Sequence, residues 1–97
     1  MDFGQFKDTL AGKTPPKALS AAERALWWDA KGDWDKAHEC AQEDDGKAAA
    51  WVHAYLHRKD GDLENASYWY RRAGKPAANG ALAAEWEGIA RGLLKRA

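Results

Sequence analysis

The sequence predicts an all-α protein, and both its composition and its turn signals point to this fold class. The 97 residues include 21 alanines and six tryptophans, whereas the β-branched residues are only two threonines, one valine and one isoleucine. Alanine has the highest helix propensity, and β-branched residues are those that favour strands. A chain of this length suits one domain with one core. We therefore expect a single helical domain in which tryptophans fill the spaces between closely packed, alanine-rich helices.

Two segments align when the sequence is shifted by 29 residues. ALWWDAKGDWDKA, residues 25–37, matches AYLHRKDGDLENA, residues 54–66, with the Gly-Asp pair at the same place in both. Glycine adopts the left-handed conformation that ends a helix, and the aspartate after it can cap the next helix. Each segment therefore predicts two helices joined by a tight Gly-Asp turn.

Caps and helix breakers set the expected helix boundaries. Ser20 and Glu23 form a capping-box signature at the start of the first hairpin. Asp44-Asp45-Gly46 separates the two hairpins, and Gly74 followed by Pro76 ends the second. Helices are expected over residues 21–31, 34–43, 47–60, 63–73 and 81–95.

The two ends of the chain are expected to complete this domain. The last helix has apolar residues at spacings of four, three and four, which form one stripe able to cover the open end of a hairpin. These residues are Leu82, Trp86, Ile89 and Leu93. Residues 1–19 are expected to form an N-terminal segment and linker, in which Phe3 and Phe6 lie on a short helix and dock onto the domain of residues 20–97.

Composition argues against several classes of protein. The net charge is zero, with 15 basic and 15 acidic residues, so no overall attraction to nucleic acid or anionic membranes is expected. No apolar run approaches the roughly 20 residues that span a bilayer, and the N-terminus lacks the apolar region of a secretory signal. Cys40 is the only cysteine, which fits a reducing compartment. We expect a soluble cytoplasmic protein.

The repeated segments resemble a known class of helical repeats. The Gly-Asp turn, the small residues and the aromatic-plus-alanine ending resemble tetratricopeptide repeats, and GDLENASYWYRRAG resembles the second half of a Sel1-like repeat. In that half, Ala66, Trp69, Tyr70 and Ala73 occupy the matching positions. The period of 29 is shorter than the roughly 34 residues of tetratricopeptide units, so a compact five-helix domain is expected rather than a regular superhelix. The resemblance implies protein or peptide binding on the face formed by the first helix of each hairpin.

Four residues are the candidate partner-binding site on that face. At about 100° per residue, His53 and His57 lie opposite the expected core stripe of their helix, and the 29-residue shift relates them to Arg24 and Trp28. The four residues would form two neighbouring columns on one face. Exposed tryptophan beside arginine is the composition of a binding hot spot. We expect Trp28 to be the anchor, with Arg24 and His57 as polar contacts, in a non-enzymatic adaptor or scaffold that needs no cofactor.

The alternative is a small-molecule or transition-metal-binding protein that uses the same histidines. Two histidines at i and i+4 on a helix can share one ion. A third ligand is the difficulty, because His38, Glu39 and Cys40 lie on the preceding helix and no pattern in the sequence brings them to the pair.

Two further interpretations have less support. The run Tyr68 to Arg72 combines aromatic and basic residues, as single-stranded nucleic acid sites do, but its rings occupy the packing positions of the repeat. The first hairpin, residues 20–46, carries a net charge of −5, and residues 47–76 carry +3. This polarity favours attraction between hairpins or weak self-association over binding of a polyanion. No phosphate loop, nucleophile elbow or metalloprotease motif is present, so no catalytic residue is expected.

Overall fold

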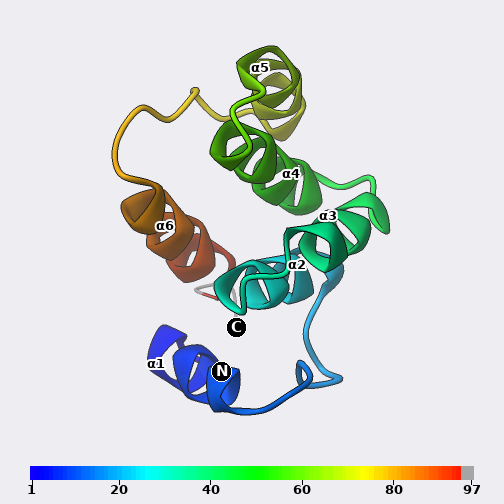
Figure 1. The fold of residues 1–97 in the computed structure, drawn as a ribbon, viewed down its shortest axis with the longest axis vertical. Helices are drawn as coiled ribbons and strands as arrows, with labels where there is room; N and C mark the ends of the chain where they lie inside the picture. Colours follow the sequence, from blue (N-terminus) through cyan, green and yellow to red (C-terminus); the bar gives the residue numbers. More distant parts are fainter. Residues whose placement is uncertain (95–97) are drawn as a thin grey trace.

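The computed structural model describes residues 1–94 and shows an all-α fold, as the sequence predicted (Figure 1). The described residues form helices and contain no strand. No helix among them is both long and apolar enough to cross a membrane. The helices are α1 (Phe3–Asp8), the 3-10 turn η1 (Thr9–Ala11), α2 (Ala21–Ala30), α3 (Trp34–Gln42), α4 (Lys47–Lys59), α5 (Leu63–Ala73) and α6 (Leu82–Leu94). The last expected helical position, Lys95, lies outside the described residues.

The two Gly-Asp turns have the same geometry, 29 residues apart. Gly32 and Gly61 have φ angles of 84° and 85°, in the left-handed region that only glycine adopts readily. In each turn the aspartate that follows donates its backbone N–H to the helix before it and accepts the N–H of the third residue of the helix after it. This combination ends one helix and caps the next within two residues. It therefore sets α2 against α3 and α4 against α5.

Helix α4 occupies the centre of the molecule. It packs against α2, α3, α5 and α6, and Figure 1 shows these helices on its different sides. Residues 52–57 of α4 are consequently all buried, including both histidines. The prediction that α4 has one core face and one solvent face is therefore wrong for its middle turns. A helix enclosed by four others has no solvent face there.

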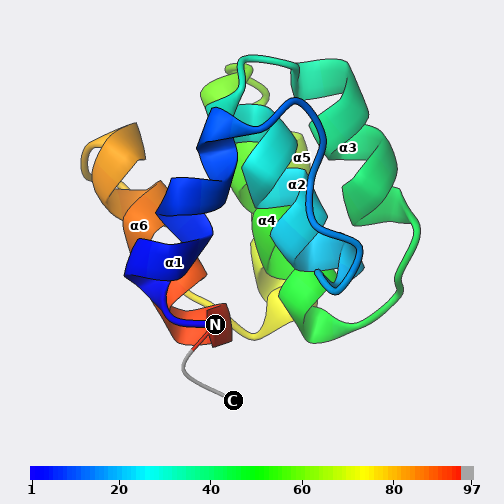
Figure 2. The ribbon, with the colours of Figure 1, turned by 90° about the horizontal axis from the view of Figure 1, so that it is seen from below.

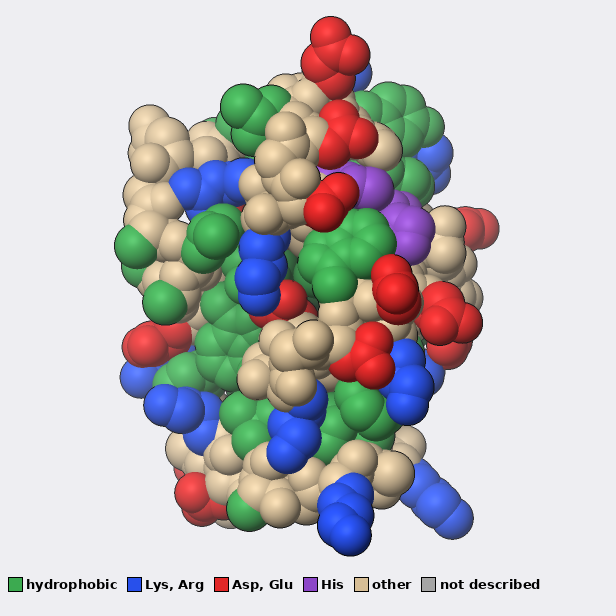
Figure 3. Space-filling view, in the orientation of Figure 1, with side chains coloured by type: hydrophobic (Ala, Val, Ile, Leu, Met, Phe, Trp, Pro, Cys, Tyr) green, Lys and Arg blue, Asp and Glu red, His purple; other side chains and the backbone are tan. Residues whose placement is uncertain are grey.

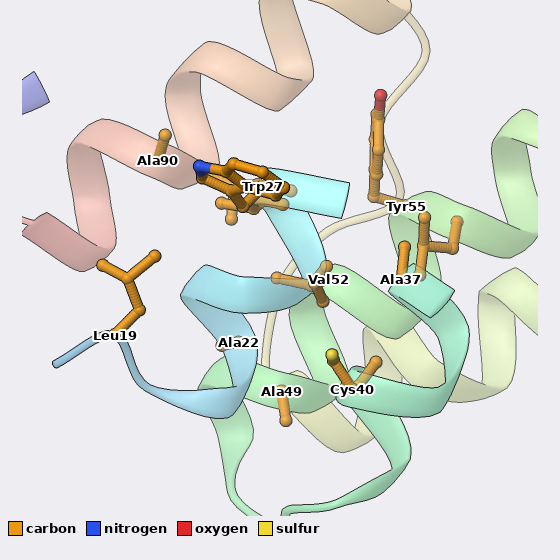
Figure 4. Packing of buried hydrophobic residues seen from close by; sticks show 14 of the residues in the cluster. Leu19, Ala22, Trp27, Ala37, Cys40, Ala49, Val52, Tyr55 and Ala90 are labelled. Carbon is orange, nitrogen blue, oxygen red and sulfur yellow. The ribbon is translucent and has the colours of Figure 1, made fainter. Parts of the chain in front are cut away.

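The core is rich in alanine, and most tryptophans lie at its margin. Figure 4 shows small residues such as Ala22, Ala49 and Cys40 where helices approach closely. Trp27 is the only tryptophan with no exposed surface, and the other five are partly exposed. Trp34 and Trp86 still fix neighbouring helices, because each indole N–H donates to a backbone carbonyl of another helix, at 2.9 and 3.1 Å.

The N-terminal segment contributes to the same core as the rest of the chain. Phe6 has no exposed surface, and its ring lies 5.9 Å from that of Trp86 in α6. Phe3 contacts the same indole edge-on at 6.0 Å. Figure 2 shows α1 lying beside α6, with the chain that follows it running across α2. Both phenylalanines therefore dock as expected, on α6.

Candidate functional site

Three histidines from two helices meet at the junction of the two hairpins. His38 comes from α3, and His53 and His57 come from successive turns of α4. One ligand atom of each lies within 4.8 Å of those of the other two. The Nε2 atoms of His38 and His53 are 3.0 Å apart, a hydrogen bond in which one imidazole donates and the other accepts. These three residues form what we call the imidazole cluster.

Two tryptophans hold the imidazole cluster from either side. The Trp34 ring stacks on His38 with centroids 4.8 Å apart, and the Trp69 ring stacks on His53 at 3.9 Å. Trp34 also donates its indole N–H to the backbone carbonyl of Leu56, which ties α3 to α4 beside the cluster. Rings fixed by stacking and by a hydrogen bond have little rotamer freedom, so the cluster is pre-organised.

Burial makes the two imidazoles of α4, His53 and His57, poor bases. His53 is 4% exposed and His57 is 8% exposed, whereas His38 is half-buried. Burial, and then the neighbouring His38 and His57, lower the pKa of His53 to about 4. Burial, and then His38, lower the pKa of His57, although Asp62 and Asp60 oppose this. At neutral pH both imidazoles are uncharged, which is the form that binds metal ions.

One nitrogen of the cluster has no hydrogen-bonding partner among the described residues. It is Nδ1 of His57, which is fully buried. Leaving a buried polar atom unpaired costs about 1–3 kcal/mol, so such atoms are rare in folded proteins, and a bound ion is one way to satisfy them. Figure 3 shows imidazole atoms at the molecular surface between apolar and acidic side chains, so the cluster is accessible to a small ion.

Of the four residues expected to form one binding face, His53 and His57 stack with ring centroids 4.9 Å apart, whereas Arg24 and Trp28 make other contacts. His53 and His57 were expected to be exposed, and this was wrong: both are buried and face α3 and α5, because α4 is central. Arg24 instead pairs at 2.9 Å with Glu43, the residue that follows α3. Trp28 lies edge-on against Trp27, with the ammonium of Lys36 4.3 Å from its ring. Among the described residues, no hydrogen bond, ion pair or ring contact joins Arg24 or Trp28 to the histidines.

His38 is the third potential ligand, which the sequence alone did not bring to His53 and His57. Of the three candidates on α3, only His38 joins the cluster; Glu39 is exposed, and Cys40 is buried with its Sγ 3.8 Å from the Arg24 guanidinium. A signal was present in the spacing of Trp34 and His38, which are one turn apart and so share a face. That face packs on α4. This packing depends on how the two hairpins cross, and no local sequence pattern encodes the crossing.

Comparison with known proteins adds no assignment, since no family model, curated protein or solved structure matches this chain.

Proposed function

We propose that this protein binds a divalent transition-metal ion, with zinc as the first candidate, through His38, His53 and His57. The observation that carries the proposal is the convergence of three imidazoles from two helices, with one ligand atom of each within 4.8 Å of the others. It is the alternative that the spacing of His53 and His57 suggested, now with a third ligand.

The distances are close to those of a metal site. Zinc–nitrogen bonds of about 2.0–2.1 Å in tetrahedral geometry place two ligand nitrogens about 3.3–3.4 Å apart. The 3.0 Å between His38 and His53 is slightly shorter than this, and the largest separation in the cluster is 4.8 Å. Small rotations of the side chains would bring all three nitrogens to one ion. The ion would replace the hydrogen bond between His38 and His53 and satisfy a ring nitrogen of His57.

The donor set narrows the choice of metal. Three imidazole nitrogen donors suit zinc, copper, nickel or cobalt, whereas magnesium and calcium prefer oxygen ligands. Three protein ligands also leave a coordination position for water or another small ligand. In the protein, His53 and His57 are already neutral, and the stacking of Trp34 on His38 and of Trp69 on His53 already holds two of the rings in place.

The test is calorimetric titration of zinc chloride into protein from which metal has been removed with a chelator. We expect one ion per chain with a dissociation constant in the micromolar range or below. Replacing zinc with cobalt(II) should produce the visible absorption bands of a low-coordinate site. His38→Ala and His57→Ala should each weaken binding by at least about tenfold, the effect of losing roughly 1.4 kcal/mol of binding free energy.

Cys40→Ala is the matched control, because Cys40 lies on the same helix as His38 but outside the cluster. It should bind zinc as the unmodified protein does. If zinc does not bind, or if all three variants bind equally well, the imidazoles form only an aromatic stack between two tryptophans and the proposal fails.

A second candidate function is protein or peptide binding at Arg24 and Trp28. The observation that favours it is that Trp28 is partly exposed on α2, beside an arginine that is also partly exposed. The resemblance to tetratricopeptide and Sel1-like repeats supports the same role. Trp28→Ala should lower affinity for a partner more than it lowers the melting temperature, and a large fall in melting temperature with binding intact would contradict this.

A further inference from the structure

A pocket of about 390 Å³ lies on another part of the surface, between the N-terminal segment, α2, α4 and α6. None of the imidazole cluster lines it. Figure 3 shows apolar side chains between α6 and the central helices, with basic and acidic groups beside them. The residues that line the pocket are Lys7, Leu10, Asp29, Ala30, Tyr55, Lys59, Leu82, Ala83 and Trp86.

The polar groups of the pocket are held in fixed positions. Asp29 is 5% exposed; it accepts a hydrogen bond of 2.8 Å from the Tyr55 hydroxyl and one of 2.9 Å from the Lys59 ammonium. Burial, and then Asp29, raise the pKa of Tyr55, which therefore stays a neutral donor. The Lys59 ammonium is partly exposed, and a lysine ammonium has three N–H groups. Two of them remain available to a ligand.

The rest of the lining is apolar, with one further positive charge. The Trp86 ring is fixed because its N–H donates to the carbonyl of Leu26 at 3.1 Å. Lys7 forms no ion pair with any residue among 1–94. Two lysines against one aspartate give the lining a net charge of +1.

We infer that this pocket binds a small organic monoanion, namely a carboxylate attached to an apolar body. The apolar walls would bury the body, and Lys7 with the free N–H groups of Lys59 would pair with the carboxylate. A cationic ligand is disfavoured, because both lysines would repel it and the Asp29 oxygens already accept hydrogen bonds. The volume lies at the small end of the roughly 300–1,000 Å³ of ligand pockets, which indicates a small molecule.

The experiment is a titration followed by amide and indole NMR, with phenylacetate and hexanoate as probes and phenylacetamide as the neutral match of the first. We expect saturable shifts of the Trp86 indole N–H with either acid. Phenylacetamide should bind about tenfold more weakly, as expected when a charge-assisted hydrogen bond is lost. Absence of saturable shifts with both acids up to about 10 mM, well beyond millimolar affinity, would overturn the proposal.

Three variants locate the site and separate charge from shape. Lys7→Gln should weaken phenylacetate several-fold and leave phenylacetamide unchanged. Ala83→Phe should fill the pocket and abolish the shifts, whereas Ala84→Phe, exposed on the same helix but outside the lining, should not. Binding that survives Ala83→Phe, or phenylacetamide binding as tightly as phenylacetate, would contradict the assignment. None of these readouts depends on metal binding.

Discussion

At the scale of single residues, the chemistry of His53 is set by its surroundings rather than by its place in the sequence. The ring lies against Trp69, with the imidazoles of His38 and His57 on its other sides. Those neighbours provide no negative charge that would stabilise an imidazolium, and water is largely excluded. Protonation of His53 therefore favours the unfolded state, and folding lowers the affinity of His53 for a proton.

This opposition predicts how the stability of the metal-free protein depends on pH. Well above pH 6.5 the His53 imidazole is neutral in both the folded and the unfolded chain, and its full contribution to stability is present. Between about 6.5 and 4 the unfolded chain takes up a proton that folded His53 does not, so the free energy of unfolding falls. The difference in pKa corresponds to a loss of up to about 3 kcal/mol.

Urea unfolding of the chelator-treated protein at pH 7 and pH 4.5 measures this loss. His53→Phe keeps the aromatic stack but removes the titrating group, so its stability should fall less over the same pH range. Equal pH dependence in both proteins would show that other groups cause the loss.

At the scale of the elements, the two Gly-Asp turns form the hairpins because their backbone conformation suits glycine alone. A side chain at Gly61 meets no neighbour within 4 Å, but its φ of 85° is strained for any other residue. Gly88 also has open space around its Cβ position, but lies in the middle of α6 with ordinary helical backbone.

These two glycines provide a matched pair of substitutions. Gly61→Ala should lower the free energy of unfolding by about 1 kcal/mol or more, because alanine must adopt a left-handed conformation. Gly88→Ala should raise it by roughly 0.5–1 kcal/mol, because alanine is the better helix former. Chemical denaturation of both variants tests the prediction. Destabilisation by Gly88→Ala would show that α6 does not tolerate a side chain at this position.

At the scale of the whole molecule, the proposed metal would join the two hairpins. His38 belongs to the first hairpin, and His53 and His57 belong to the second. A ligand that binds only the folded state stabilises it, by about 2.7 kcal/mol when its concentration is 100 times its dissociation constant. Zinc should therefore raise the melting temperature of the unmodified protein and of Cys40→Ala clearly more than that of His38→Ala. Scanning calorimetry with and without zinc measures this, and an equal rise in His38→Ala would place the ion elsewhere.

The N-terminal segment is predicted to unfold together with the rest of the chain. Phe6→Ala removes a fully buried ring from the core and should cost about 3–5 kcal/mol. Phe3→Ala, at the half-buried neighbouring position, should cost clearly less. Tryptophan fluorescence during urea unfolding should show one transition in each variant. A loss below about 1 kcal/mol for Phe6→Ala would contradict a shared core.

The all-α class and the helix boundaries could be predicted from the sequence because they depend on local chemistry. Ser20 caps α2 through its side chain, Gly32 and Gly61 end helices in left-handed conformations, and Gly74 ends α5 in the same way. Each of these effects acts within a few residues, so the predicted helices over residues 21–31, 34–43, 47–60 and 63–73 differ from the observed ones by at most one residue.

Only the tertiary structure decided which helix would be enclosed and which side chains would meet. The periodicity of α4 predicted a core stripe and an outer face, but four neighbouring helices enclose its middle turns, and His53 and His57 are buried there. The same packing brought His38 to them from another hairpin, and brought Lys7 and Asp29 to one pocket from distant segments. Local pattern fixes the direction of a side chain relative to its own helix, whereas burial and convergence depend on how separate helices cross, which is set by the packing of the whole core.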